Sequence, residues 1–392
     1  MREGWVSHRF DEVFDLQMGK TPARDNPSYW GDGNIWVSIA DMKDVKYISS
    51  SKEQITDIAV RESGIKPVKK GTAIMSFKLS IGKAAIASTE LYTNEAIMSF
   101  SVKDGHRVKP EFIYYFLKGF KWAGANKAVM GFTLNKKTIA SNIFSYPPIA
   151  EQERIVAELD CLTGIIEKKK QQLEELDKLA QSIFYDMFGD PITNEKGWKV
   201  KRLGDLCEVI TKGTTPSSLG FSFVEKGINF LKVESFNSDE TLNEAKIFHI
   251  TKECDAALQR SRLEANDILM CIAGATCGRL AIVPSSVIPA NTNQAFGIIR
   301  LKDKEQSFHR YIYSFLHSSF IRDSVNELMK GVAQPNLTLA HLRGFCILLP
   351  PPALQNEFAQ KIETIVKQKE LLKQSIRETE TLFSSRMDYW FN

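Results

Sequence analysis

The sequence predicts a mixed α/β protein built as two tandem lobes of short strands plus helices, with a long antiparallel two-helix coiled-coil spacer. Three observations carry this prediction: an internal repeat along the whole chain, a heptad-patterned segment after each copy, and a polar, turn-rich segment between the copies. A chain of 392 residues is long enough for two or three domains. Repeat units this long exclude a solenoid, whose units are roughly 20–50 residues long.

The internal repeat defines the domain boundaries. Its offset begins at 193 residues and grows to 203, which indicates small loop insertions in the second copy. Matching segments include Gly19-Lys20-Thr21-Pro22 with Gly213-Thr214-Thr215-Pro216, and Asn94-Glu95-Ala96 with Asn293-Gln294-Ala295. We expect a first lobe at 1–149, a spacer helix at 150–189, a linker at 190–197, a second lobe at 198–352 and a second spacer helix at 353–392. This pseudo-twofold plan suits contact with two places on one extended partner.

The two segments that follow the lobes have the pattern of coiled-coil helices. Residues 151–188 contain no proline and a single glycine, and their apolar positions alternate by three and four over more than four heptads. Adding 203 to each position reproduces the same frame in the second segment. The expected seam comprises Ile155, Leu159, Leu162, Ile166, Leu173, Leu176 and Ile183, with Phe358, Ile362, Ile365, Leu372, Ile376 and Phe383.

Each of these helices needs a partner for its seam. Prolines at 147–148 and 350–352 define where the helices begin, and about 38 residues would extend roughly 57 Å. A helix this long would expose an apolar stripe to water, so we expect the two helices to pair with each other. Polar residues at Lys169, Lys369, Thr379 and Arg386 interrupt the seam and would fix its register or face another subunit. The alternative of two ordinary core helices is weaker, because such helices rarely exceed about 20 residues.

Both lobes have the pattern of short strands separated by glycine-bearing loops. Strand-like runs occupy 35–39, 72–77, 84–87 and 96–100, with counterparts at 230–233, 268–272, 280–283 and 296–301. One helix is expected in each lobe, at 110–120 and at 308–320.

The basic surplus of the chain belongs to the lobes. Residues 151–188 carry five basic and nine acidic side chains, and residues 354–392 carry six of each, whereas the whole chain has a formal charge of +4. Such a surplus fits a polyanion such as nucleic acid, although a solvated basic surface would also explain it. Lysine and arginine can contact phosphates, and Arg, Gln, Asn and Thr can contact base edges. The candidate DNA-binding residues are Lys20, Thr21, Lys78, Lys83, Lys127, Lys136, Lys137, Lys212, Thr214, Thr215, Arg279, Lys330, Gln334 and Asn336.

The chain contains no recognisable catalytic motif and no metal-binding motif. The sequence has no GxxxxGK[ST] loop, no HExxH and no paired Cys/His set, and its six histidines are scattered. We therefore expect no catalytic residues and no metal site. The six cysteines form no CxxC pair and lie mostly in apolar surroundings, so we expect buried, reduced thiols. With no apolar run near 18 residues and no signal peptide, a cytoplasmic protein that contacts no membrane is expected.

These features resemble the specificity subunits of Type I restriction-modification systems over essentially the whole length. The resemblance is carried by the lobe openings at Trp5 and Trp198, by PPIAEQERIV at 147–156, by FGDPITNEKGW at 188–198 and by GVAQPNLT at 331–338. The first lobe departs from the pattern at 131–135, where the glutamine-bearing form is replaced by Gly-Phe-Thr-Leu-Asn.

The resemblance implies two target-recognition domains, each reading one half of a bipartite double-stranded DNA target. It also implies that two methylation subunits dock onto the helices and lobes to form an adenine-N6 methyltransferase, and that restriction (translocase) subunits complete the complex. S-adenosylmethionine, ATP and magnesium would be bound by those partners, and this chain would bind no cofactor. Two alternatives remain: a protein-interaction scaffold without DNA binding, and an autonomous DNA enzyme with a hidden site.

Overall fold

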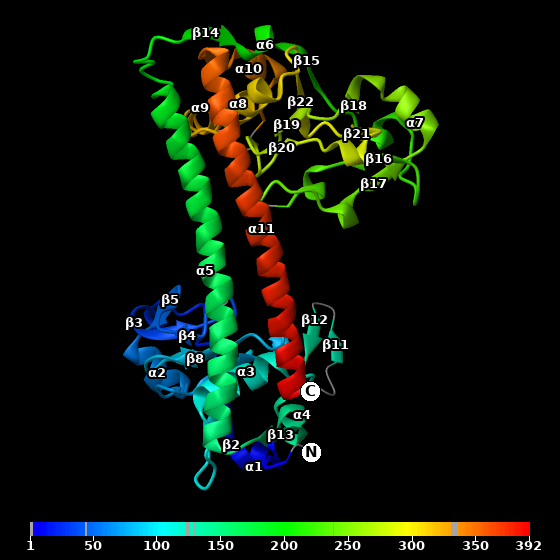
Figure 1. Ribbon diagram of the computed structural model, residues 1–392. Helices are drawn as coiled ribbons and strands as arrows, with labels where there is room; N and C mark the ends of the chain where they lie inside the picture. Colours follow the sequence, from blue (N-terminus) through cyan, green and yellow to red (C-terminus); the bar gives the residue numbers. More distant parts are fainter. Residues whose placement is uncertain (1–2, 44, 123–125, 129–130, 238, 331–335) are drawn as a thin grey trace. The chain divides into compact units, whose positions relative to one another are not determined.

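The structure is a computed structural model that describes all residues except 1–2, 44, 123–125, 129–130, 238 and 331–335 (Figure 1). The chain divides into two compact units, one formed by residues 1–171 with 373–392 and the other by residues 172–372. Each unit therefore contains one lobe and one end of each long helix. This division follows from the antiparallel pairing of the helices α5 (Ile149–Phe188) and α11 (Pro352–Phe391), each 40 residues long.

The first unit is built around a five-stranded sheet in the order β2-β10-β6-β8-β4. Its central strands β6 (Ala73–Ser76) and β10 (Ile97–Val102) are apolar and buried, whereas the edge strand β2 (Phe14–Met18) alternates between buried and exposed residues. Strands β8 (Ala84–Ala87) and β4 (Tyr47–Ile48) complete the sheet.

Among the described residues, smaller sheets and short helices complete the lobe. The sheets have the orders β1-β13, β5-β3-β9 and β11-β12-β7. Their strands are β1 (Val6–Arg9), β13 (Ile143–Tyr146), β5 (Glu53–Ile55), β3 (Trp30–Val37), β9 (Tyr92–Thr93), β11 (Asn126–Ala128), β12 (Gly131–Thr133) and β7 (Lys78–Leu79). The helices are α1 (Phe10–Val13), α2 (Asp57–Ser63), α3 (Pro110–Gly119) and α4 (Lys136–Ser141).

The second unit repeats this plan. A four-stranded sheet has the order β15-β22-β19-β20, a second has the order β17-β16-β21-β18, and β14 pairs with β23. The strands are β14 (Lys199–Arg202), β15 (Cys207–Lys212), β16 (Ile228–Leu231), β17 (Phe248–Ile250), β18 (Arg262–Leu263), β19 (Ile268–Cys271), β20 (Leu280–Ile282), β21 (Ala290–Thr292), β22 (Phe296–Leu301) and β23 (Cys346–Leu349). The helices are α6 (Leu203–Leu206), α7 (Lys252–Ala257), α8 (Gln306–Leu316), α9 (Ser319–Met329) and α10 (Leu339–Gly344).

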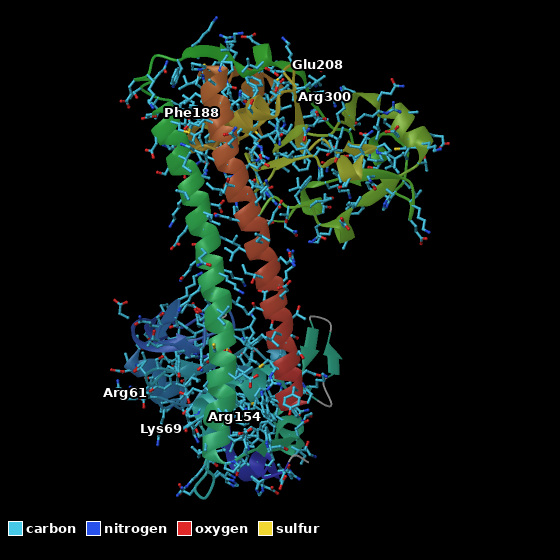
Figure 2. The ribbon with its side chains drawn as sticks, in the orientation of Figure 1. Arg61, Lys69, Arg154, Phe188, Glu208 and Arg300 are labelled. Carbon is cyan, nitrogen blue, oxygen red and sulfur yellow. The ribbon has the colours of Figure 1, made fainter. Side chains whose placement is uncertain are left out.

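The ends of the long helices complete the core of each lobe. In the first unit, Ile155 and Leu159 of α5 pack with Trp390 and Phe391 of α11 among the phenylalanines of α3. In the second unit, Phe188 of α5 packs against Phe358 of α11 with a ring separation of 5.1 Å. Figure 2 labels Arg154 and Phe188 near the two ends of α5. Burial of these aromatic side chains stabilises each lobe by about 1.5–3 kcal/mol per residue.

A buried glutamine fixes the start of each long helix. The Gln152 side chain accepts a hydrogen bond from the Lys109 backbone N–H at 2.9 Å and donates to the carbonyl oxygens of Arg107 and Pro147. Gln355 occupies the equivalent place and donates to the Pro350 carbonyl at 2.8 Å. The repeat therefore extends to a specific polar contact at the helix entry.

The fold class is confirmed, but several local predictions are wrong. The helix expected at 308–320 is two helices, because Ser318 is extended (φ −64°, ψ 158°) and ends the α-helical run after α8. The strand expected at 35–39 ends at Val37, and the run at 230–233 ends at Leu231, since 3₁₀ turns or bends follow both. Cys161 and Cys346 are exposed, contrary to the expected burial, while Cys207, Cys254 and Cys271 are buried.

In the described part of the chain, no helix is both long and apolar enough to span a membrane.

Candidate nucleic-acid interface

Most candidate residues of the first lobe lie at one end of its five-stranded sheet. Because neighbouring strands are antiparallel, β2 and β6 end where β10 and β8 begin. The segments 19–22, 77–83 and 94–96 therefore meet at this end. We call it the lobe 1 interface.

Backbone hydrogen bonds join the turn after β2 to the segment at the start of β10. The backbone N–H groups of Gly19 and Lys20 donate to the carbonyl oxygens of Ile97 (3.1 Å) and Thr93 (2.8 Å). A Cβ at Gly19 would overlap the carbonyl oxygens of Thr93 and Asn94, so only glycine permits this approach. The turn thus presents Lys20 and Thr21 in a fixed position.

Glu95 is the centre of a small polar network. It accepts a hydrogen bond from the Thr21 hydroxyl. Burial opposes its ionised form, but the Thr21 hydrogen bond and the charges of Lys78 and Arg24 outweigh this and lower the pKa of Glu95. Arg24 also forms a bidentate ion pair with Glu53 at 2.5 and 3.0 Å and stacks over Trp30 at 3.8 Å. A network of this kind presents both donors and an acceptor at the surface.

The remaining lobe 1 candidates reach the same end of the sheet through backbone pairing. The Lys83 carbonyl accepts from the Ser76 N–H at 2.8 Å, directly beyond β6. Lys127 lies on β11, which pairs with β12, and Thr133 of β12 pairs with Lys78. The Leu134 N–H donates to the Phe77 carbonyl at 2.9 Å, which places the start of α4 beside this turn.

Lysines line two hollows along the exposed edge of β2. Lys20, Lys66 and Lys136 line a hollow of about 500 Å³, and Lys136 and Lys137 line a second one of about 530 Å³. Asp15 lines both hollows, 3.8 Å from Lys103. The Lys20 ammonium also donates to the Ser63 carbonyl. The lysine groups outnumber the carboxylates, so this edge suits an anionic ligand.

The second lobe builds the equivalent surface, the lobe 2 interface. The N–H groups of Gly213 and Thr214 donate to the carbonyl oxygens of Phe296 (3.2 Å) and Thr292 (3.0 Å). The Thr215 hydroxyl donates to Gln294, the counterpart of Glu95. Gly213 likewise has no room for a Cβ. Lys212 lies at the exposed end of β15, directly before this turn.

The Arg279 side chain forms a hydrogen bond within its own lobe. Its guanidinium donates to the Phe236 carbonyl at 3.0 Å, and its side chain is half-buried. Asn336 forms a bridge with Ala273, and the Leu337 N–H donates to the Ile272 carbonyl at 2.8 Å, so this segment lies beside the β19–β20 connection. Lys330 is exposed directly after α9. Gln334 lies outside the described residues.

Sequence reasoning missed three basic residues at these surfaces. Arg24 and Lys66 join the lobe 1 interface through the contacts above. In lobe 2, Arg260 donates to the Thr214 hydroxyl at 3.1 Å. None of the three lies in a segment that repeats between the copies; Arg24 follows the first turn by two residues, whereas only the fold brings Lys66 and Arg260 to the turns. The repeat of Asn94-Glu95-Ala96 as Asn293-Gln294-Ala295 was the available signal for Glu95 and Gln294.

Comparison with protein families identifies both lobes together with their helices. A model described as the Type I restriction modification DNA specificity domain matches residues 2–178 and again residues 195–381. The chain belongs to this family. It is a Type I restriction-modification specificity subunit with two target-recognition domains.

Two relatives are similar over most of the chain. The Type I restriction enzyme MjaIX specificity subunit of Methanocaldococcus jannaschii is 26% identical, and the match covers 92% of this chain and 86% of that protein. The Type I restriction enzyme EcoBI specificity subunit of Escherichia coli is 25% identical, over 69% of this chain and 62% of its own length.

Two solved structures share the fold. A chain from a structural study of complex assembly and conformational transition of the type I R-M system has a TM-score of 0.62 at 18% identity, covering 100% of this chain and 98% of that one. The crystal structure of the S subunit from M. genitalium has a TM-score of 0.51 at 14% identity, covering 98% and 95%.

The spacer helices of this specificity subunit pair along the expected seam. Ile155, Leu159, Phe358, Ile365 and Ile376 are buried. The other expected seam residues are partly buried, and they are Leu162, Ile166, Leu173, Leu176, Ile183, Ile362, Leu372 and Phe383.

The polar residues that interrupt the seam join the two helices. In the first unit, the Lys169 ammonium donates to the hydroxyls of Ser375 (2.7 Å) and Thr379 (2.8 Å). Arg386 pairs with Glu158 there, and in the second unit Lys369 pairs with Asp177. An antiparallel register is thus fixed by side-chain pairs in both units.

No group of three or more His, Cys, Asp or Glu side chains is placed to hold a metal ion, within the residues that the structure describes.

Proposed function

We propose that each target-recognition domain reads one half of a bipartite double-stranded DNA sequence through its interface. The supporting observation is that two diverged copies place lysine, threonine and either Glu95 or Gln294 at the same end of an equivalent sheet. A scaffold that bound protein would have no reason to keep basic residues around this turn in both copies. Arg24, Lys66 and Arg260 strengthen the same surfaces.

The two parts of each interface have different roles in this proposal. Lysines along the β2 edge, with Lys212 and Arg260 in the second domain, contact phosphates and hold the domain on the duplex. Residues of the connections after β6 and β19 and of the segments ending at 133 and 338 contact base edges, because they include amide and hydroxyl side chains. Gln334 and Asn336 carry the amides of these segments, whereas their lysines, Lys78, Lys83, Lys127 and Lys330, contact phosphates.

We propose further that the paired helices set the distance between the half-sites and dock two methylation subunits. Both helices expose apolar side chains away from their seam, namely Ile165, Leu179, Val366, Leu371, Leu382 and Tyr389. Leu371 is 68% exposed. A methylation subunit that covers these side chains would remove their apolar surface from water.

The chemistry belongs to those partners in this proposal. Methylation subunits supply S-adenosylmethionine and adenine-N6 methylation, and restriction subunits supply ATP- and magnesium-dependent cleavage. This chain contributes sequence recognition in the cytoplasm, where the DNA lies.

Methylome sequencing of a host that expresses this chain with its neighbouring methylation subunit tests the proposal. We expect one bipartite methylated motif that disappears when this chain is deleted. Replacing residues 198–349 with the equivalent domain of a relative should change one half of the motif and leave the other intact. A simultaneous change of both halves would refute independent reading.

Salt dependence separates DNA recognition from a protein scaffold. If Lys66 and Lys136 each contact a phosphate, Lys66→Ala and Lys136→Ala should each reduce the slope of log affinity against log salt by about one unit. Lys69→Ala is the matched control, because Lys69 is exposed before β6 at the other end of the same sheet (Figure 2). A wild-type slope near zero would support the scaffold.

A further inference from the structure

The two target-recognition domains anchor an equivalent connection in different ways. In the first domain residues 38–52 join β3 to β5, and in the second residues 232–247 join β16 to β17. Each connection carries a charged residue that contacts a helix of its own domain: Lys46 in the first and Glu240 in the second. The two anchors have opposite charge.

The first anchor is a lysine–carboxylate pair on the spacer helix. The Lys46 ammonium donates to both carboxylate oxygens of Asp160 on α5, at 2.5 and 2.8 Å. The Tyr115 hydroxyl of α3 donates to the same carboxylate at 2.5 Å. The Lys46 side chain is only 19% exposed, so the pair is partly shielded from solvent.

The second anchor includes a histidine. Glu240 accepts hydrogen bonds from the Tyr313 hydroxyl and, at 3.0 Å, from His317 Nε2, both at the C-terminal end of α8. Its backbone has φ +67°, a conformation that a glutamate rarely adopts. Such a conformation persists only where surrounding contacts hold it, and the two side-chain bonds supply that restraint.

The second anchor is connected to the lobe 2 interface. The Phe236 carbonyl, four residues before Glu240, accepts the hydrogen bond from Arg279. Arg279 also lies close enough to lower the pKa of Glu240 by its charge. Movement of the Phe236 carbonyl would therefore release the Arg279 guanidinium.

We propose that Glu240 is a positioning residue for the lobe 2 interface and that protonated His317 holds it, which makes recognition by the second target-recognition domain alone sensitive to pH near neutrality. The inference rests on the proposed DNA recognition. The Lys46–Asp160 pair of the first domain contains no histidine.

The surrounding charges give the direction of the effect. The hydrogen bond from His317 to Glu240 and the negative charge of Glu240 raise the pKa of His317 above 6.5, and the charge of Asp177 on α5 adds to this effect. Burial and the charge of Arg322 on α9 act in the opposite direction but are outweighed. Burial opposes ionisation of Glu240, but its contacts with His317 and Tyr313 and the charge of Arg279 lower the pKa of Glu240. Burial and Glu240 raise the pKa of Tyr313, so Tyr313 remains a neutral donor.

The Glu240–His317 ion pair is therefore fully formed below pH 6.5 as long as Glu240 is ionised. The ion pair weakens as the pH rises through the folded-state pKa of His317, because the imidazole loses its charge. The His317 side chain is 50% exposed, so solvent screens the pair. We expect a change of about two- to fivefold in discrimination at the second half-site, in keeping with exposed ion pairs.

The experiment uses the full chain with its methylation subunits and three duplexes: the methylome-defined target, and the same duplex with the first or the second half-site scrambled. Affinity is measured at about pH 6 and about pH 8.5, on either side of the titration range of histidine. Discrimination at the second half-site should fall with rising pH, and discrimination at the first should not change. His317→Gln retains an amide donor that does not titrate, so its second half-site should be insensitive to pH.

Two outcomes would overturn the inference: equal pH responses at the two half-sites, or an unchanged pH response in His317→Gln. His341, whose ring accepts the Thr338 N–H at the start of α10 beside Asn336, is the matched control position. His341→Gln should therefore leave the pH response in place. Absence of any discrimination at either pH would instead count against the proposed function.

Discussion

Lengthening both spacer helices should lengthen the unspecified gap of the DNA target. The structure shows where an insertion can be made, because Gln171 in α5 and Leu372 in α11 lie at the boundary between the two compact units. Four extra helical residues at each point leave the Lys169–Ser375 contact on one side and the Lys369–Asp177 pair on the other. Both core ends of the helix pair also remain unchanged.

The expected size follows from helix and duplex geometry. Four residues add about 6 Å of helix and rotate it by about 40° beyond one full turn. Along B-DNA this length equals one to two base pairs at about 3.4 Å each. Two base pairs rotate the duplex by about 70°, from about 10–10.5 base pairs per turn. The rotations have the same hand, so DNA twist must absorb only about 30°, and a gap one to two base pairs longer is expected.

Methylome sequencing of cells carrying the variant measures the gap directly. Duplicating residues 173–176 in α5 alone is the matched control, because it shifts one helix against the other and must break the register on one side. That single insertion should lower the thermal midpoint and reduce methylation, whereas the paired insertion should retain both half-sequences. An active paired variant with an unchanged gap would show that the helices do not measure the spacing.

Three further predictions concern stability and contact. Gly19→Ala and Gly213→Ala should each lower the free energy of unfolding of their own domain by more than about 2 kcal/mol, because a methyl group would overlap backbone carbonyls. In the same denaturant titrations Gly164→Ala should raise the free energy of unfolding by about 1 kcal/mol, because a methyl group there meets open space on α5. Gln152→Leu should lower the free energy of unfolding by about 2–4 kcal/mol, because it leaves the Lys109 N–H and two carbonyls unpaired. Gln355→Leu, which loses its bond to one carbonyl, should cost less; equal losses would contradict this account. Lys330→Ala should lower the affinity for all duplexes alike and reduce the slope of log affinity against log salt by about one unit, whereas Gln334→Ala should lose about 1–3 kcal/mol of binding free energy at one base position only. Wild-type binding by both variants would place the contact surface elsewhere in the domain.

The overall architecture could be predicted from periodic and repeated patterns in the sequence. A heptad repeat needs only nearest neighbours along one helix to be recognised, and the same frame at an offset of 203 residues marked both spacer helices. Internal repetition marked the two domains, because residues such as Gly19 and Gly213 are required by the same close backbone approach in each copy. The helix break at Ser318 was not predictable, since the sequence around it continues the apolar pattern of a helix.

The composition of the interfaces was only partly predictable. Thr21 and Lys78 could be selected as polar or basic loop residues, but their convergence on Glu95 depends on the order of strands in the sheet. Lys66 and Arg260 gave no signal, because each reaches its turn from a part of the chain that is distant in sequence.

By itself, the sequence determined that this protein has two related domains, two paired helices and membership of the specificity-subunit family. These properties are encoded in periodicity and repetition, which survive without knowledge of any contact. Only the tertiary structure decided which charges meet: Lys46 with Asp160 in one domain, and Glu240 with His317 in the other. Such pairs depend on positions 77 and 114 residues apart being brought within hydrogen-bonding distance, and no local pattern specifies that approach.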